Sequence, residues 1–183
     1  MSKGDSIKSR EPSLLIRWLV HRLSTNYHLQ NDMTKNVKEL FDLTGKTAIV
    51  TGGSRGIGKE MAEALAEAGA SIMLCARRAE WLEDTVNEFA ARGFNVAGKV
   101  CDVSNAEEVQ AVVDSTVKRF HSVDILINNA GISWGAMPEE MPLEQWQKVL
   151  NVNLTGCSLM AQAAGREMLK QNSGSIINIA SIA

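Results

Sequence analysis

Glycines with a regular spacing lie directly after a short apolar run. Gly52, Gly56 and Gly58 follow residues 47–51 (Thr-Ala-Ile-Val-Thr) and precede a stretch with helical periodicity. Such a loop lets the backbone turn tightly and lets a phosphate approach a helix N-terminus, where unpaired N–H groups and the helix dipole favour an anion. Glycines between strand and helix also occur for steric reasons alone, but a position after the first strand of a βαβ unit favours nucleotide binding.

Polar side chains follow three later apolar runs. Asp102, Asn129 and Ser181 each come just after such a run, and Asn153 lies within a stretch of helical periodicity. The first three would meet at the carboxyl edge of a parallel sheet, where ligands of open α/β folds bind. Three of these four residues also have a purely structural interpretation. Asp102 could cap the turn before a helix, Asn129 could satisfy loop backbone through an Asx turn, and Asn153 could be a polar packing residue.

Strands and helices alternate along residues 43–183. Apolar runs predict strands at 47–51, 71–76, 95–101, 124–128 and 175–180, and helical spacing predicts helices at 57–68, 80–92, 104–120 and 143–170. Ser104 occupies the N-cap position of the third helix, with Glu107 at capping-box spacing. Buried strands joined by right-handed helical crossovers make an open, doubly wound parallel sheet. We therefore expect an α/β Rossmann fold in residues 43–183, truncated after the fifth strand.

The motifs in this order resemble those of the short-chain dehydrogenase/reductase family. The loop of residues 51–58 is similar to the family's T-G-x-x-x-G-x-G, and residues 128–131 to its N-N-A-G. Asn153 matches the helix asparagine of the family, Ser181 its catalytic serine, and Asp102 an aspartate near the adenine. The resemblance covers about residues 43–183. It points to members similar to gluconate 5-dehydrogenases and 3-oxoacyl-[acyl-carrier-protein] reductases.

The resemblance implies a bound NAD(P) cofactor. The residues expected to hold it are Gly52, Ser54, Arg55, Gly56, Ile57, Gly58, Arg77, Arg78, Asp102, Val103, Asn129, Ala130 and Gly131. Where NAD-binding members carry an acid after the second strand, this chain has Ala76 followed by Arg77 and Arg78. Guanidinium groups pair well with a 2′-phosphate, so NADP(H) is favoured. NAD stays an alternative if these arginines are merely solvated, and Arg55 is a weaker clue because similar NAD enzymes also carry it.

The resemblance also implies hydride transfer between the cofactor and an alcohol or carbonyl substrate. Ser181 would hold the substrate oxygen, and Asn153 would anchor a water in a proton relay. The family's Tyr-x-x-x-Lys pair has no match, since Tyr27 is the single tyrosine and has no lysine four residues on. We therefore expect this chain to be inactive, as a fragment or as the translation of an incompletely assigned gene. The alternative is a dinucleotide-binding module without chemistry.

Two further expectations concern the substrate and assembly. Trp134, in the loop after residues 128–131, either walls the substrate pocket or packs within a turn. Family members are commonly dimers or tetramers, so the intact protein is expected to be a homo-oligomer. The predicted strand at 175–180 would be an uncharged, isoleucine-rich edge, which is prone to aggregate when nothing covers it.

Composition excludes several other classes of function. The net charge is −2, and neither a basic patch for nucleic acid nor an acidic tail is present. The fractions of hydrophobic (45%) and charged (22%) residues are those of a soluble globular protein, which we expect to be cytoplasmic. Cys75, Cys101 and Cys157 lack the spacing of a metal site or disulfide framework, and no histidine lies at ligand spacing, so no metal is predicted.

Residues 1–42 precede the alternating strands and helices. The apolar stretch 14–20 is broken by Arg17 and is too short to span a bilayer, so no membrane partner is predicted. Apolar residues at helical spacing make a short amphipathic helix one interpretation. The favoured interpretation is a non-native leader, with Met33 as the start of the native chain.

Overall fold

The computed structural model describes residues 36–181, and the chain divides into two units between Asp42 and Leu43. In the first unit, a single helical turn, α2 (Val37–Leu40), begins at Asn36, whose side chain and that of Glu39 form a capping box. The stretch predicted as a leader or an amphipathic helix lies outside the described residues. No helix among the described residues is long and apolar enough to cross a membrane.

Five parallel strands form the sheet of the second unit, in the order β3-β2-β1-β4-β5. The strands are β1 (Thr47–Thr51), β2 (Ser71–Ala76), β3 (Val96–Val100), β4 (Ile125–Asn128) and β5 (Ser175–Asn178). The helices are α3 (Gly56–Glu67), α4 (Ala79–Ala91), α5 (Ala106–Phe120), α6 (Leu143–Leu150) and α7 (Gly156–Gln171), with a short 3₁₀ turn at Pro138–Glu140. The predicted doubly wound α/β Rossmann fold is therefore confirmed.

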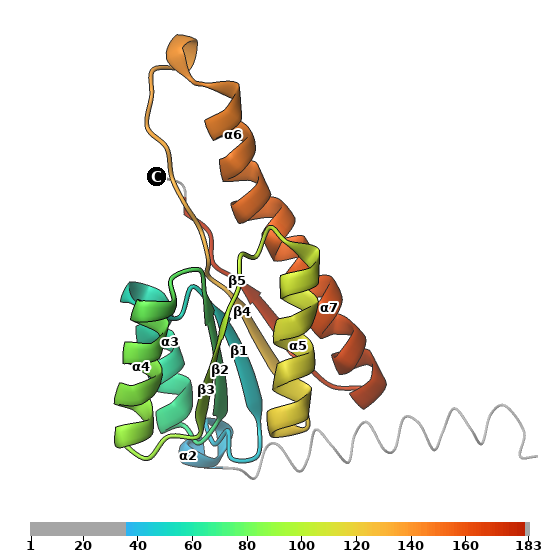
Figure 1. Ribbon diagram of the computed structural model, residues 1–183. Helices are drawn as coiled ribbons and strands as arrows, with labels where there is room; N and C mark the ends of the chain where they lie inside the picture. The colour runs from blue at the N-terminus through green and yellow to red at the C-terminus, as the bar shows by residue number, and fades with distance from the viewer. Residues whose placement is uncertain (1–35, 182–183) are drawn as a thin grey trace, which may run out of the picture. The chain divides into compact units, whose positions relative to one another are not determined.

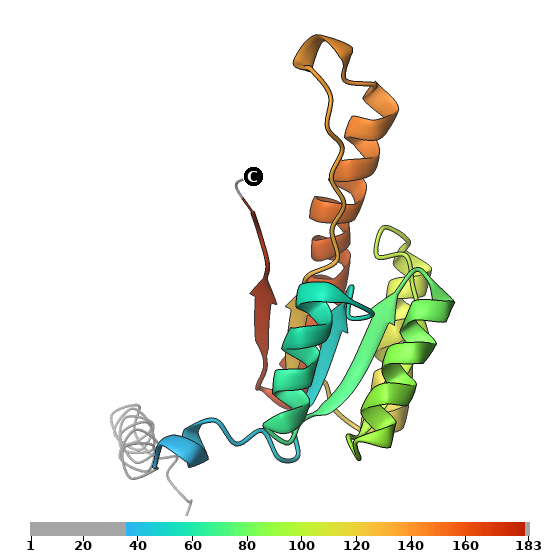
Figure 2. The ribbon, with the colours of Figure 1, turned by 90° about the vertical axis from the view of Figure 1, so that its left-hand side faces the viewer.

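Helices cover both faces of the sheet. Helices α3 and α4 pack on one face, and α5 and α7 pack on the other (Figure 1). Figure 2 shows α3 and α4 in front of the strands and β5 at the free edge of the sheet. Alternation along β1 divides the core accordingly, since Ala48 and Val50 belong to one buried cluster and Ile49 to the other.

The order of the strands creates a switch point at β1. The chain passes from β1 to β2 and β3 on one side, and then returns to β4 and β5 on the other. The connections after β1 and β4 consequently diverge from the carboxyl edge of the sheet and leave a crevice between them. The glycine loop leaves β1 at this point.

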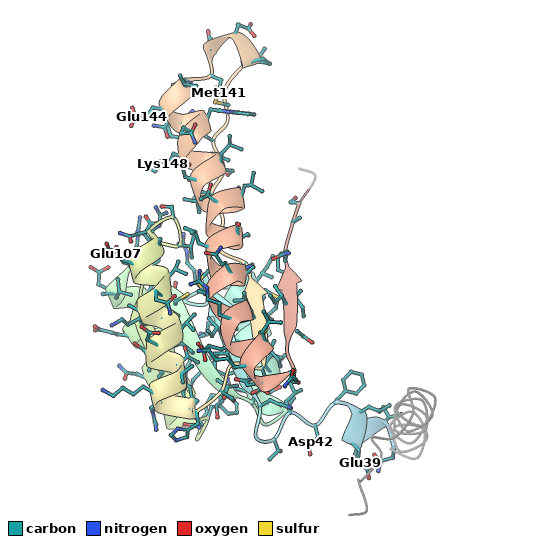
Figure 3. The ribbon with its side chains drawn as sticks, turned by 90° about the vertical axis from the view of Figure 1, so that its right-hand side faces the viewer. Glu39, Asp42, Glu107, Met141, Glu144 and Lys148 are labelled. Carbon is teal, nitrogen blue, oxygen red and sulfur yellow. The ribbon has the colours of Figure 1, made fainter. Side chains whose placement is uncertain are left out.

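The long helix predicted over 143–170 is present over residues 143–171 and contains a local π turn. Helix α6 is followed by a π turn at Asn151–Thr155 and then by α7. A π turn widens one turn without ending the helix, and the apolar pattern predicted the helix but not this turn; π turns occur frequently at functional sites. Helix α6 carries no buried residue and extends beyond the carboxyl ends of the strands (Figure 1). Its Glu144 and Lys148 project from the same side, above Glu107 at the start of α5 (Figure 3).

The predicted capping of the third helix is wrong by one residue. Asn105, not Ser104, is the N-cap of α5, and its Oδ1 accepts hydrogen bonds from the N–H groups of Glu107 and Glu108. Ser104 instead donates from its N–H and its hydroxyl to the Asp102 carboxylate. Both residues are strong caps, and the turn around Asp102 decides between them.

Strand β5 has the exposed edge that the sequence predicted. All of its residues are exposed, including Ile176 (40%) and Ile177 (47%), and β4 is its only partner among the described strands. Uncovered strands of this kind pair readily with other chains.

Candidate functional site

A cavity of about 560 Å³ opens at the switch point of the sheet. Its walls come from the glycine loop, the residues after β2 and β3, and the segment after β4. The lining residues are Gly52, Ser54, Arg55, Ile57, Gly58, Cys75, Ala76, Arg77, Arg78, Trp81, Cys101, Val103, Asn129, Ala130, Gly131, Ile132 and Val152. Most residues predicted from the motifs thus meet in one place, and its volume lies within the usual range for ligand pockets.

The glycine loop has the shape needed to admit a ligand at the N-terminus of α3. Gly52 and Gly56 take positive φ angles of 66° and 54°, which side chains rarely tolerate. A Cβ on Gly58 would clash with the Gly52 carbonyl and with Asn129, so the loop and helix approach each other as only glycine allows. Above Gly56, in contrast, an added Cβ would meet nothing within 4 Å. The loop is therefore tightly packed against the protein at Gly58, whereas the space above Gly56 is open to a ligand.

Thr51 and Asn129 hold the glycine loop against the segment that follows β4. The buried Thr51 Oγ1 accepts hydrogen bonds from the N–H groups of Asn129 and Ala130, each 2.9 Å long. The Asn129 amide donates in return to the Thr51 carbonyl at 3.0 Å. The Asx turn considered from the sequence is not what Asn129 forms. Thr51 is missing from the predicted residues, although its place at the start of the T-G motif was a usable signal.

Asn128 ties together three elements behind the site. Its buried amide donates to the Asn178 side chain on β5 at 2.9 Å and to the Cys157 carbonyl on α7 at 3.2 Å. These bonds fix the ends of β4 and β5 relative to each other. Ser181 follows β5 on this edge and is exposed.

Asn153, in the π turn, binds the backbone of the segment after β4. Its Oδ1 accepts from the Ile132 N–H, and its Nδ2 donates to the Ile132 carbonyl, both at 2.9 Å. The Asn153 side chain thus satisfies both backbone groups of Ile132, a residue that lines the cavity. Neither Asn153 nor Ser181 is among the described residues that line the cavity, and Trp134, expected either as a pocket wall or as a packed turn, lies outside that set and is 51% exposed.

Three arginines, Arg55, Arg77 and Arg78, give the cavity its charge. All three are exposed, and among the described residues none has a carboxylate within salt-bridge distance. The cavity lining contains no aspartate or glutamate among the described residues. The site is therefore suited to an anion. Trp81, which the sequence did not indicate, lies beside Arg55 and Arg78.

Asp102 lies in an adjoining cavity, which shares Arg77 and Val152 with the first. Its Oδ1 accepts from the Ser104 N–H at 2.9 Å and from the Ser104 hydroxyl at 2.7 Å. Partial burial raises the pKa of Asp102, but these hydrogen bonds and the charges of Arg77 and Lys148 outweigh it, and the net pKa is lowered. The carboxylate thus shapes the turn before α5, as the structural interpretation of the sequence allowed.

Two thiols lie on the cavity floor without the environment of a nucleophile. A hydrogen bond to Cys101, together with burial, raises the pKa of Cys75 well above its usual value. The same bond lowers the pKa of Cys101. Both residues are almost fully buried, at 0% and 1% exposure, and no group of metal-ligating side chains occurs among the described residues. The thiols therefore serve packing in this site.

Known proteins provide an independent comparison. The family description "short chain dehydrogenase" matches residues 46–183. The chain is 42% identical over 142 residues to the 3-oxoacyl-[acyl-carrier-protein] reductase of Synechocystis sp., covering 77% of this chain and 58% of that protein. It is 38% identical over 144 residues to the gluconate 5-dehydrogenase of Gluconobacter oxydans, covering 79% and 56% of the two chains.

Solved structures agree with the sequence comparison. A short-chain type dehydrogenase/reductase from Mycobacterium marinum has a TM-score of 0.78 and 40% identity, over 81% of this chain and 60% of that one. A gluconate 5-dehydrogenase from Burkholderia cenocepacia, in complex with NADP and tartrate, has a TM-score of 0.75 and 38% identity, over 80% and 57%. The chain thus spans less than two thirds of these proteins. Its sheet, its glycine loop and these matches together show that the chain belongs to the short-chain dehydrogenase/reductase family.

Proposed function

We propose that the cavity at the glycine loop binds NADP(H), and that the protein transfers hydride between this cofactor and an alcohol or carbonyl substrate. The observation that carries the proposal is the charge of the lining: three arginines and no acid among the described residues. A 2′-phosphate needs such a surface, whereas NAD recognition uses an acid that accepts a hydrogen bond from the ribose. The relative from Burkholderia cenocepacia, solved with NADP, supports the same assignment.

Each proposed contact follows from the position of the residue. Gly52, Ser54, Gly56, Ile57 and Gly58 would hold the pyrophosphate at the N-terminus of α3, where free N–H groups favour an anion. Arg55, Arg77 and Arg78 would bind the 2′-phosphate, and Asp102 and Val103 would lie near the adenine. Asn129, Ala130 and Gly131 would border the nicotinamide end. The open space above Gly56 fits a ligand there.

Two residues are proposed for the substrate side. Ser181 would donate a hydrogen bond to the substrate oxygen from the carboxyl end of the edge strand. Asn153 would hold the loop at Ile132 in place, because the Oδ1 and the Nδ2 of its amide both bind the Ile132 backbone, and would support a proton relay from there. The bound cofactor supplies the hydride, and the protein has to supply orientation and a proton.

Cofactor titration tests the binding part of the proposal. The purified protein is expected to bind NADPH at least about tenfold more tightly than NADH, because a charge-assisted pair adds well over 1 kcal/mol. Replacing both Arg77 and Arg78 by alanine should remove this preference. Arg166→Ala, an exposed arginine on α7, is the control and should leave it unchanged. Equal affinities for NADPH and NADH in the unaltered protein would contradict the assignment.

Turnover tests the chemical part. The 183-residue sequence contains no Tyr-x-x-x-Lys pair. We therefore propose that this polypeptide alone binds NADPH but does not oxidise it with carbonyl substrates. NADPH absorbance at 340 nm would be followed with a panel of aldehydes, ketones and keto acids, and consumption above background would refute this claim. A dinucleotide-binding module without chemistry is favoured instead if the gene encodes no such pair downstream.

The intact protein is proposed to be a cytoplasmic homo-oligomer. Apolar side chains exposed on α6 and its continuation support self-association, with Leu143 77%, Trp146 52% and Leu154 67% exposed. Light scattering after size-exclusion chromatography measures the mass directly. A monomer at micromolar concentration would contradict the proposal.

A further inference from the structure

Trp81 stacks on two of the three arginines of the cavity. The guanidinium carbons of Arg55 and Arg78 lie 3.9 Å and 4.1 Å from the centroid of its ring. All three residues line the cavity, and the indole is half-buried in the first turn of α4. Both distances are well inside the range over which a cation is attracted to an aromatic face.

The two arginines come from different parts of the chain, and Trp81 lies where those parts meet. Arg55 is the N-cap of α3, and Arg78 is the N-cap of α4. The buried hydroxyl of Thr85, one turn after Trp81, hydrogen-bonds to the Ser54 carbonyl at 2.8 Å and to the Trp81 carbonyl at 3.0 Å. The Thr85 hydroxyl therefore links the glycine loop directly to the first turn of α4, which carries Trp81.

Ion pairs extend the same contact along both helices. Lys59 of α3 pairs with Glu88 of α4 at 2.6 Å, and Arg92 at the end of α4 pairs with Glu63 at 2.6 Å and Glu67 at 3.2 Å. The partners on α3 are Lys59, Glu63 and Glu67, which are four residues apart and so lie in one row along the helix. Arg55 lies four residues before Lys59 at the start of this row. In this row Arg55 differs from Lys59, because its partner is an indole and not a carboxylate. Its charge consequently stays available to a ligand.

The guanidinium groups of Arg55 and Arg78 repel each other, because both are positively charged and, among the described residues, neither forms a salt bridge with a carboxylate. A dianionic phosphate bound to both would relieve that repulsion. Long arginine side chains normally lose much rotamer freedom when they bind, and stacking on a fixed ring removes that freedom beforehand. We propose that Trp81 is a positioning residue for cofactor specificity, which holds Arg55 and Arg78 in a ready-made site for the 2′-phosphate of NADP(H). The inference rests on the proposed function, since it explains how the arginines act there.

The test compares the unaltered protein with Trp81→Leu and Trp81→Phe by titration with NADPH and NADH. Leucine keeps an apolar contact but has no π face, and phenylalanine keeps the face. Trp81→Leu should weaken NADPH binding about tenfold, as expected for the loss of two exposed cation–π contacts, with NADH affinity changed less than about twofold. Trp81→Phe should retain most of the preference. Titration with 2′-AMP and 5′-AMP should show the same split.

A double-variant cycle and a matched control separate positioning from packing. In an Arg78→Ala background, Trp81→Leu should have a smaller effect on NADPH affinity, because part of what the indole holds is gone. Phe94→Leu is the control, since Arg92 stacks on Phe94 at 4.8 Å away from the cavity. It should alter melting temperature without altering the ratio of NADPH to NADH affinity.

The outcomes distinguish this inference from the proposed function. If the unaltered protein shows no preference for NADPH, the proposed function fails. If it shows the preference and Trp81→Leu keeps it, the proposed function stands and the role of Trp81 is refuted. Equal weakening of NADPH and NADH binding by Trp81→Leu would likewise refute it, because that result describes a packing residue.

Discussion

Polar side chains lie at both the amino and the carboxyl ends of the paired strands β1 and β4. The two ends differ in whether their charged groups have partners within the protein. At the amino edge, the Asp124 carboxylate accepts from the Thr47 N–H at 3.0 Å, the Ser122 hydroxyl at 2.7 Å and Lys46 at 3.2 Å. The carboxylate is thus neutralised by a lysine and surrounded by donors. This end stabilises the fold and offers nothing to a ligand.

At the carboxyl edge, the hydrogen bonds keep a space open instead. Thr51 and Asn129 bind the backbone of the two diverging connections, and among the described residues none of the arginines around the resulting cavity forms a salt bridge. The same pair of strands therefore carries a stabilising end and a binding end. The difference lies in whether charge is compensated within the protein. We expect substitutions at the amino edge to change stability alone, and substitutions at the carboxyl edge to change cofactor affinity as well.

The largest effect is expected for Thr51→Val. Valine has the same shape but leaves the N–H groups of Asn129 and Ala130 without their acceptor, at a cost of about 2–4 kcal/mol in the free energy of unfolding. NADPH affinity should fall as well, because both residues border the cavity. Thr47→Val, at the other end of the same strand, is the control. It loses one 3.2 Å bond from Ser122 and should leave NADPH affinity unchanged. Denaturant titrations and cofactor titrations measure both quantities.

Gly58→Ala should mainly weaken binding. The added Cβ clashes with the Gly52 carbonyl and with Asn129, so the loop has to shift, at about 1–3 kcal/mol of overpacking. We expect NADPH affinity to fall by about ten- to hundredfold. Gly165→Ala, in α7, meets nothing within 4 Å and should stabilise the helix by about 0.5–1 kcal/mol. A Gly58→Ala protein with unchanged affinity would show that the loop does not bind the cofactor.

Asp124→Asn should lower stability without touching the cavity. The amide cannot replace every bond of the carboxylate, and the pair with the half-exposed Lys46 is lost, so we expect about 1–2 kcal/mol. NADPH affinity should not change. Asp114→Asn is the control, because Asp114 is exposed and bonds only to Gln110 of its own helix among the described residues. A large loss of NADPH affinity in Asp124→Asn would end the proposed separation of the two edges.

The smallest effect is expected in the pH dependence of stability. Burial raises the pKa of Asp124, but hydrogen bonds from Ser122, Thr47 and Lys46 outweigh it, and the net pKa is lowered. The unfolded state then binds a proton more readily, so the free energy of unfolding decreases as pH falls from the unfolded pKa, about 3.9, towards the lower folded pKa. Melting temperatures between about pH 6 and pH 3 should decrease less in Asp124→Asn than in the unaltered protein. Parallel curves would show that Asp124 does not titrate as expected.

Most of the fold could be predicted because local and global signals agree. The bounds of β1 and β2 match the predicted strands residue for residue, since each is a short apolar run ended by a turn. The π turn at Asn151–Thr155 and the N-cap at Asn105 could not be predicted in this way. The π turn accompanies a contact with a distant segment, since Asn153 binds Ile132, whereas the N-cap is decided by the hydrogen bonds of Ser104 to Asp102, which apolar spacing does not show.

The site shows the same division. The sequence by itself determined the strands, the crossovers and the glycine loop, because apolar periodicity and glycine spacing act locally. It also indicated which polar residues would reach the carboxyl edge. Only the tertiary structure decided that Thr51 binds the connection after β4, that Asn153 binds Ile132, and that one indole stacks on arginines from two different turns. Apart from the contact between Arg78 and Trp81, these contacts join residues far apart in the chain, and their partners are chosen by how the helices pack against the sheet.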